Sequence, residues 1–328
     1  MFFDLPAATK IYENLPKHYR TPHCHPTYIT IDALRGDYRA PEFFIFQKNN
    51  CIYYHAYIKG SANQLIDRES AYGYGGPIAT SSDKDFINAS WEAYAQSCYA
   101  ANTIAEFIRF HPILNNSRFY KGTVTDNRET VWIDLQSNYE NQYKERTIQK
   151  IRYSKARNVT VKWEKSLSLY DFFCETYYQH MAQLNADPLY FFSREYLSRL
   201  LFWDKAHLAV AFQDGAPIAA AIFLIDGYIC DYHLAATINS KHAREALTVL
   251  VDAAAHYAQK QGCRVLHLGG GRTQAPDDSL LFFKESFSNQ RAYFLVGSTI
   301  WNYKIIDELR KDFIHRNGYE PNRTLFYR

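Results

Sequence analysis

Apolar and polar residues alternate over several short segments of the chain, and this spacing of two predicts β-strands. Three such segments follow one another in the second half, at 207–213, 217–225 and 228–235. Asp214-Gly215 and Asp226-Gly227 separate them. Because Asp-Gly between alternating runs is a strong hairpin signal, the three segments predict an antiparallel meander.

Helical spacing, with apolar residues three or four positions apart, surrounds this meander. The expected helices are 168–186, 193–203, 244–261 and 302–316, and further strands are expected at 263–268 and 292–301. Gly262 follows the third of these helices and suits a helix end. The predicted order is therefore two helices, three strands, then helix, strand, helix, strand, with the short helix near 280 described below.

The first half predicts a less regular α/β unit. Residues 1–25 predict no regular element, and the alternation over 27–32 predicts a strand. Residues 42–47 and 51–58, joined by Lys48-Asn49-Asn50, predict a hairpin. A helix is expected from Asp83 or Asp85 to about residue 102, and strands at 105–114 and 130–135.

The segment 266–288 joins a buried strand to a short helix through three glycines, Gly269 to Gly271. Glycines let the backbone adopt positive φ and let a ligand approach closely. A loop with Pro276 and the cap-forming residues 277–279 precedes the helix. Leu280, Phe283, Lys284 and Phe287 then fall on one helical face. A lysine in an apolar stripe either extends its amine to water or is held there for chemistry.

Composition adds bounds on class and location. The 328 residues are 47% hydrophobic, enough for one large or two ordinary domains. A net charge of +3 is too small to indicate, on its own, a protein that binds nucleic acid, and we expect no DNA partner. Six widely spaced cysteines indicate reduced thiols, and no apolar run is long enough for a signal peptide or a membrane span. His23-Cys24-His25 lacks the spacing of a zinc site, so we expect no metal and a cytoplasmic protein.

Basic residues gather between residues 138 and 158, where helical spacing also occurs. They are Lys144, Arg146, Lys150, Arg152, Lys155 and Arg157. Such a run is either a solvated helix face that joins two domains or a phosphate-facing patch for a nucleotide-sugar or a tRNA. We place the domain joint near Gln149.

Several motifs resemble, in order, those of the Fem-type transferases, the peptidoglycan bridge-forming aminoacyltransferases of the GNAT acyltransferase superfamily. The C-terminal signature is matched by HLGGG (267–271), DSL (278–280) and FKESFS (283–288). The other matches are AYGYGGPI (71–78), RFHPIL (109–114), TVWIDL (130–135), ERTIQKIRYSKARNV (145–159), YYQHMAQLNA (177–186), LYFF (189–192) and DYHLAAT (231–237). The resemblance covers nearly the whole chain, and the predicted element order of the second half agrees with a GNAT core.

The resemblance implies an α/β protein of mixed sheet, with two tandem GNAT-like domains. Domain 1 would be 1–148, with 311–328 packing back on it, and domain 2 would be 149–310 and carry the acyl-transfer site. The sequence contains no long heptad stretch, so we expect no inserted coiled-coil arm.

The resemblance also implies site residues. Lys284 matches the family's functional lysine, and Phe283 beside it would shape the pocket. Substrate contacts are implied for Tyr72, Tyr74, Gly75, Asn185, Tyr190, Tyr232, Gly270 and Gly271. His233 is a catalytic candidate, with a hydrogen-bonded core histidine as the alternative; it and Asp231 alternate with Tyr232, so they face the opposite side of their strand.

The resemblance also implies a donor and an acceptor, and two sequence features bear on their identity. Residues 237–249 occupy the place of the glycine-rich pyrophosphate loop of acetyl-CoA users but contain no glycine. This favours an aminoacyl-tRNA donor over acyl-CoA, and no tightly bound cofactor is expected. The expected acceptor is a phosphate-bearing sugar precursor of the cell envelope, which would bring the protein to a membrane surface if it is lipid-linked. Gln183 stands where the family commonly has an arginine, so a surface-polysaccharide precursor is an alternative to the usual peptidoglycan one.

Two alternatives remain open. One is an acyl-CoA-dependent N-acyltransferase that acts on an amino-sugar of surface polysaccharide. The other is a non-catalytic module that binds glycan precursors.

Overall fold

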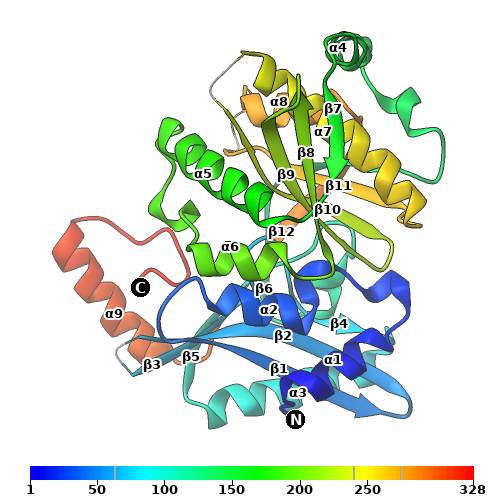
Figure 1. Cartoon of the computed structure of the whole chain (residues 1–328). Helices are drawn as coiled ribbons and strands as arrows, with labels where there is room; N and C mark the ends of the chain where they lie inside the picture. The colour runs from blue at the N-terminus through cyan, green and yellow to red at the C-terminus, as the bar shows by residue number, and fades with distance from the viewer. Residues whose placement is uncertain (63, 239–240, 274, 276) are drawn as a thin grey trace. The chain divides into compact units, whose positions relative to one another are not determined.

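The computed structural model describes residues 1–328 except 63, 239–240, 274 and 276; the side chains of 62 and 241–244 are also not described. Pro276 therefore lies outside the described residues. The chain forms two compact units (Figure 1): unit 1 contains 1–128 and 293–328, and unit 2 contains 129–292. The predicted boundary between the domains is at 148/149, and the segment predicted to pack back on domain 1 is 311–328.

Unit 1 begins with two helices that the sequence patterns did not predict. Residues 1–25, expected to be irregular, contain α1 (Leu5–Glu13), which Asp4 caps by accepting a hydrogen bond from the Ala7 amide. The strand expected at 27–32 is wrong, because those residues lie in α2 (Pro26–Ala33). Pro26 provides a helical φ in the first turn, and His25 Nδ1 accepts from the Thr27 amide. The helix is buried on several sides, so its apolar residues show no clear helical period.

The sheet of unit 1 has the strand order β1-β2-β3-β5-β12. Its strands are β1 (Arg39–Lys48), β2 (Cys51–Ala62), β3 (Leu65–Glu69), β5 (Thr103–Arg109) and β12 (Gln290–Ile300), with the short β4 (Ile78–Ala79) beside β2. The β1–β2 hairpin is as predicted, with Lys48 opposite Cys51. β3 and β5 are parallel, and β12 is antiparallel to β5.

Helices pack on both faces of this sheet (Figure 1). Tyr53 and Tyr57 of β2 point to α3 (Lys84–Ala100), whose predicted cap, Asp83, accepts from the Phe86 amide. Tyr54 points to the opposite face, where its hydroxyl donates to the Cys24 carbonyl. The last helix, α9 (Tyr303–Asn317), packs beside β5, and the side chain of Arg328 pairs with Asp67 and Glu69 of β3.

Unit 2 has the strand order β6-β11-β10-β9-β8-β7. The strands are β6 (Thr123–Asp134), β7 (Thr160–Trp163), β8 (Ala206–Gln213), β9 (Ala216–Asp226), β10 (Ile229–Thr237) and β11 (Val265–Gly270). The two predicted Asp-Gly hairpins join β8 to β9 and β9 to β10. β6 starts in unit 1 and ends in unit 2, and β12 does the reverse, so each unit completes its sheet with a strand from the other half of the sequence.

The described helices of unit 2 are α4 (Glu145–Ala156), α5 (Leu167–Gln183), α6 (Arg194–Leu201), α7 (Lys241–Lys260) and α8 (Ser279–Glu285), with short 3-10 turns at Tyr139–Gln142 and Pro188–Tyr190. α4 packs on α7 and α8 on β11, and the other three cover the faces of the meander. α7 packs on β8 and β9 through a cluster that includes Ala209, Ala221 and Leu250, whereas α5 packs on β9 and β10 and α6 on β8 (Figure 1). No described helix exceeds the 20 residues of α7, as expected for a chain without an inserted arm.

Candidate active site

Two parallel strands of unit 2 separate at their carboxyl ends. β10 and β11 pair at three positions, from Ile229 opposite Val265 to Asp231 opposite His267. Beyond these, β10 continues along β9 to Thr237, while β11 continues along β6 to Gly270. Register shifts follow Tyr232 in β10 and His267 in β11. We call the place where β10 and β11 separate the fork. In open sheets with parallel strands, ligands bind outside the carboxyl ends of the strands where neighbouring strands diverge, so the fork is the candidate site of unit 2.

A buried aspartate–histidine pair lies at the last position where β10 and β11 are paired. Asp231 Oδ1 lies 2.8 Å from His267 Nδ1, and both side chains are at most 2% exposed. The sequence pattern placed Asp231 and His233 on one side of β10 but missed His267. His267 lies beside Asp231 because of the parallel register of β10 and β11, and no local sequence pattern reveals that register.

The glycine-rich turn is fastened to the start of α8. Gly269 has a φ of +77°, which suits glycine, and a side chain at Gly271 would meet the Asp278 carboxylate at 2.7 Å. Asp278 accepts hydrogen bonds from the amides of Arg272 and Thr273 in the turn and of Leu280 and Leu281 in the helix. Burial raises the pKa of this carboxyl, but the amide hydrogen bonds outweigh burial and lower the pKa to about 2.

Lys284 returns from α8 to the same turn. Its Nζ donates to the Gly270 carbonyl oxygen over 2.7 Å, and the residue is 8% exposed. The ammonium group is therefore held at the end of β11, and the side chain does not extend to bulk water. An ammonium has three donors, and a fixed cation of this kind can stabilise a developing negative charge.

The helical face predicted for α8 is close to the observed one. Phe287 is fully buried in the core of unit 2, and Phe283 packs against that core with its ring 5.3 Å from Phe287 in an edge-to-face arrangement. Leu281 packs there as well, while Leu280 is only partly buried. Phe283 thus anchors the part of α8 that carries Lys284 to the apolar core of unit 2.

Tyr232 and His233 stand at the register shift of β10. The Tyr232 ring stacks on Phe223 of β9 with centroids 5.3 Å apart, and burial raises its pKa well above the usual value. His233 is partly buried. Both residues belong to the diverging part of β10, so they flank the fork, and their roles as substrate contact and catalytic group stay predictions.

Asn185 and Tyr190 occupy the connection between α5 and α6. Asn185 has a φ of +47° just after the end of α5, a conformation that asparagine tolerates. Tyr190 is 43% exposed, and its carbonyl accepts from the Tyr177 hydroxyl. The fold thus places these two on a different connection from the turn that holds Gly270, Gly271 and Lys284.

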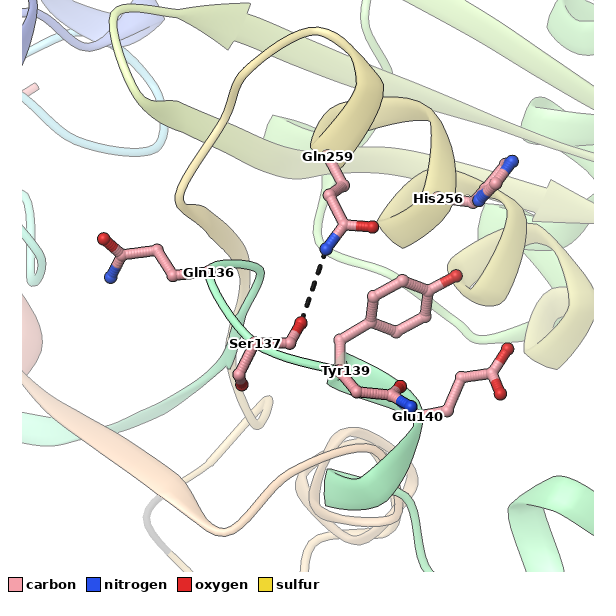
Figure 2. A pocket seen from close by; sticks show the side chains of 7 residues that line it. Gln136, Ser137, Tyr139, Glu140, His256 and Gln259 are labelled. Atoms are coloured by element: carbon pink, nitrogen blue, oxygen red, sulfur yellow. Dashed lines mark hydrogen bonds between the residues drawn. The ribbon is translucent and has the colours of Figure 1, made fainter.

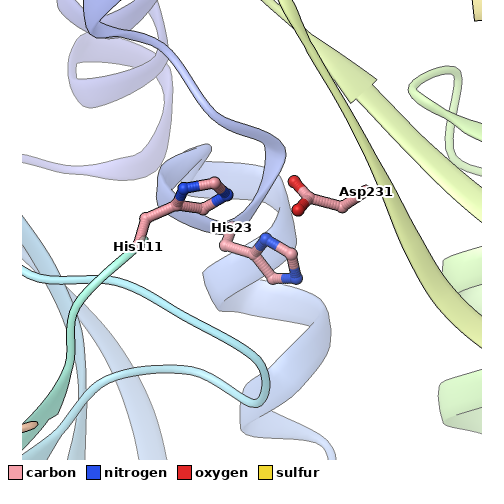
Figure 3. A group of neighbouring side chains, drawn as sticks. All are labelled: His23, His111 and Asp231. Atoms are coloured by element: carbon pink, nitrogen blue, oxygen red, sulfur yellow. The ribbon is translucent and has the colours of Figure 1, made fainter. Parts of the chain in front are cut away.

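The loop of unit 1 with Tyr72, Tyr74 and Gly75 follows β3. The Tyr72 amide donates to Asp32, and the Gly75 amide donates to the Arg109 carbonyl. The Tyr74 ring lies edge-on to His23 and His111, at 5.3 and 5.1 Å between centroids. Figure 3 shows these two histidines of unit 1, and it also labels Asp231, which belongs to β10 of unit 2. The loop is therefore ordered mainly by backbone hydrogen bonds and aromatic contacts.

Unit 2 also has an open hollow of about 560 Å³ away from the glycine-rich turn (Figure 2). It is lined by Gln136, Ser137, Asn138, Tyr139, Glu140, His256 and Gln259. Gln259 Nε2 donates to the carbonyls of Leu135 and Ser137, so its amide ties the loop to α7. None of the residues predicted for the site lines this hollow.

Comparison with known proteins identifies the fold. No protein family matches the sequence, and no curated protein matches it. Among solved structures, FemX is similar with a TM-score of 0.72 and 13% identity over 94% of this chain and 98% of FemX. The C-terminal domain of a protein assigned as lysylphosphatidylglycerol synthetase from Agrobacterium fabrum has a TM-score of 0.60 and 11% identity, over 95% and 98%. L-PGS from Bacillus licheniformis has a TM-score of 0.58 and 12% identity, over 89% and 90%.

These likenesses confirm the mixed α/β fold and the Fem-type resemblance at the level of the fold. FemX is matched over nearly all of its length as well as that of this chain. Among the helices that the structure describes, none has the length and apolar character needed to cross a membrane.

Proposed function

We propose that this protein is an acyltransferase that forms an amide on an amine of a nucleotide- or lipid-linked cell-envelope precursor, with aminoacyl-tRNA as the donor. The observation that supports the proposal is Lys284, held at the Gly270 carbonyl beside the fork between β10 and β11. The similar fold of FemX and of a protein assigned as lysylphosphatidylglycerol synthetase favours this class.

The reaction couples one bond formed to one bond broken. The acceptor amine attacks the ester carbonyl of the donor, and a C–N bond forms as the carbonyl oxygen becomes an oxyanion. The C–O ester bond then breaks, and the leaving ribose oxygen takes the proton that the amine gives up. Lys284 is the group proposed to stabilise the oxyanion, because its charge is held in place before the reaction begins.

The remaining site residues have narrower roles in this proposal. Phe283 would form an apolar wall beside the reacting carbon, and Gly270 and Gly271 would allow close approach of the donor to the backbone. Tyr232, Asn185 and Tyr190 of unit 2 are proposed contacts to the acceptor, and His233 is the further catalytic candidate on β10. Tyr72, Tyr74 and Gly75 of unit 1 are proposed as substrate contacts in their own loop. The proposed acceptor is a precursor of peptidoglycan or of surface polysaccharide, and Gln183 in place of the family's arginine makes the second a plausible acceptor.

The donor is the sharpest point to test, because an acyl-CoA-dependent N-acyltransferase acting on an amino-sugar is the competing enzyme. Calorimetric titration of the purified chain with acetyl-CoA separates the two. We expect no binding at micromolar concentration, because residues 237–249 contain no glycine for a pyrophosphate loop. Micromolar binding would overturn the aminoacyl-tRNA donor and establish the competing enzyme class.

The second alternative, a non-catalytic module, is tested by turnover. The purified chain should release free tRNA from aminoacyl-tRNA when amino-sugar nucleotides are supplied as acceptors. Absence of transfer across a broad panel of donors and acceptors, with retained acceptor binding, would favour the binding module instead.

A further inference from the structure

Helix α4 in unit 2 has a buried face and a basic exposed face. Thr147, Ile151 and Ser154 are buried against the unit, which fixes which side of the helix points outwards. Between Lys144 and Arg157 the chain has six basic residues and one acidic residue, Glu145. Glu145 accepts a hydrogen bond from Gln149 on its own side of the helix.

Four residues form a single line along the outer side of this helix. Arg146, Lys150, Tyr153 and Arg157 are spaced by four, three and four positions, which places them on one face. Arg146 and Tyr153 are exposed, and Lys150 and Arg157 are partly exposed. We call these four residues the basic stripe of α4. At 1.5 Å per residue the stripe extends over about 16 Å, long enough to span several phosphates of one nucleic-acid strand.

The stripe includes an aromatic ring placed between cations. Tyr153 is 51% exposed, and the Arg157 guanidinium lies 4.4 Å from the centre of its ring. Positive side chains beside an exposed aromatic ring are the combination with which proteins hold the backbone and stack the bases of single-stranded nucleic acid.

A membrane surface would require a different arrangement. Helices that bind membranes lie with an apolar face inserted among the lipids. The apolar side of α4 is already buried in unit 2, where Ile151 belongs to the core cluster and Ile148 packs against it. Apart from Gln149 and Ala156, the exposed side of α4 carries charged side chains and Tyr153, which suits RNA rather than lipid.

We propose that the basic stripe of α4 binds the phosphodiester backbone of the RNA donor, with Tyr153 stacking on an unpaired base. This inference rests on the proposed function for the identity of the RNA, and it assigns to the chain a docking surface separate from the fork that carries Lys284.

The test is the affinity of the full chain for fluorescently labelled, deacylated tRNA, measured by anisotropy over a range of KCl concentrations. The variant is Arg146→Gln/Lys150→Gln/Arg157→Gln. Its matched control is Lys304→Gln/Arg310→Gln/Lys311→Gln on α9, where all three side chains are exposed. Both changes lower the formal net charge from +3 to 0, so they differ in position and not in total charge.

We expect the stripe variant to bind tRNA about tenfold or more weakly at low salt, with a salt dependence of log Kd that is shallower by about 2 to 3 units. The α9 control should keep the wild-type affinity to within about twofold, because α9 takes no part in the proposed phosphate contacts and only those contacts set the local attraction. Tyr153→Ala should weaken binding by about fivefold or more, whereas Tyr153→Phe, which keeps the ring, should not. The melting temperatures of all variants are measured alongside.

Three results would overturn the inference. Wild-type chain that does not bind tRNA at low salt would refute it, and so would equal losses in the stripe variant and the α9 control. A stripe variant that binds tRNA normally but no longer binds vesicles of phosphatidylglycerol and phosphatidylcholine would assign the stripe to a membrane.

The outcome is separable from the proposed function because binding is measured without turnover. Stripe-dependent tRNA binding by a chain that transfers nothing would leave the docking surface standing and remove the proposed reaction. If the stripe variant instead transfers from aminoacyl-tRNA with an unchanged KM, the proposed reaction stands and the docking surface is removed.

Discussion

At the scale of single residues, the position of an ionisable group decides whether it serves structure or chemistry. Lys284 is buried and bonded to a backbone carbonyl, an arrangement that costs desolvation of the ammonium. A methionine or leucine would fill the same apolar stripe without that cost. The presence of the Lys284 ammonium is therefore explained better by a chemical role at the fork than by packing of the side chain alone.

His207 shows the opposite case, a titratable group whose neutral form supports the fold. Burial lowers its pKa to about 4, Lys165 and Lys205 also lower it, and Asp204 opposes them. Its Nδ1 lies 3.1 Å from the hydroxyl of Tyr257 on α7. The unfolded chain would bind a proton near pH 6.5, whereas the folded chain resists protonation until about pH 4.

We therefore predict that the chain loses stability as the pH falls from about 6.5 to about 4, by up to about 3 kcal/mol from this residue. Below the folded pKa both states are protonated and the loss is complete. His207→Gln, measured by urea unfolding at several pH values, should flatten this part of the profile. His256→Gln, which removes an exposed histidine from α7, serves as the control. Identical profiles for wild type and His207→Gln would show that the neutral imidazole does not matter.

Sequence patterns predicted part of the candidate site at this scale. The lysine and its apolar neighbours on α8 could be predicted because helical spacing depends only on local sequence. The Asp231–His267 pair could not be predicted, since it requires the register between β10 and β11. Asn185 illustrates another difficulty, because a positive φ after a helix explains an asparagine without any substrate.

At the scale of elements, the turn after β11 and the helix α8 act as one piece. The Asp278 carboxylate joins two amides of the turn to two amides of the helix, and Lys284 joins the helix back to Gly270. The position of the ammonium therefore depends on the carboxylate six residues earlier.

Asp278→Asn should lower the free energy of unfolding by about 1 to 2 kcal/mol, because an amide cannot accept from all four donors at once. The depressed pKa sets the pH dependence: the carboxylate contributes stability above pH 4 that is lost as the pH falls towards about 2. The difference from wild type in chemical unfolding should therefore shrink in acid. Asp277→Asn, at the exposed neighbouring position, should change little. A constant difference at all pH values would mean that the carboxylate charge is not what joins turn and helix.

Elements were predicted best where turn chemistry and periodicity agreed. Asp214-Gly215 and Asp226-Gly227 fixed the meander of β8, β9 and β10. The segment 27–32 failed because its β-branched residues alternate by chance, while Pro26 and His25 start a helix there. Tertiary burial of α2 on several sides hid the helical period that would have revealed it.

At the scale of the whole molecule, the sheet of each unit contains a parallel pair of strands, β3–β5 in unit 1 and β10–β11 in unit 2. The order of elements in the second half could be predicted, because its turns and helices are determined by residues close together in the sequence. The use of β12 in unit 1 and of β6 in unit 2 is a long-range pairing, and it could not be predicted from local patterns.

The central claim is that acyl transfer takes place at the fork of unit 2 and that the Lys284 ammonium stabilises the developing oxyanion. The most direct measurement is the single-turnover rate of amide formation from aminoacyl-tRNA by wild type, by Lys284→Met and by Lys260→Met, which removes an exposed lysine of α7. Melting temperature and KM are measured on the same samples, since loss of the Gly270 hydrogen bond alone should cost only about 1 kcal/mol of stability.

The account predicts that Lys284→Met lowers the rate by about 10² to 10³ with little change in KM, because the charge is needed most in the transition state. Lys260→Met should match the wild type. A Lys284→Met variant that is folded and transfers at the wild-type rate would contradict the account.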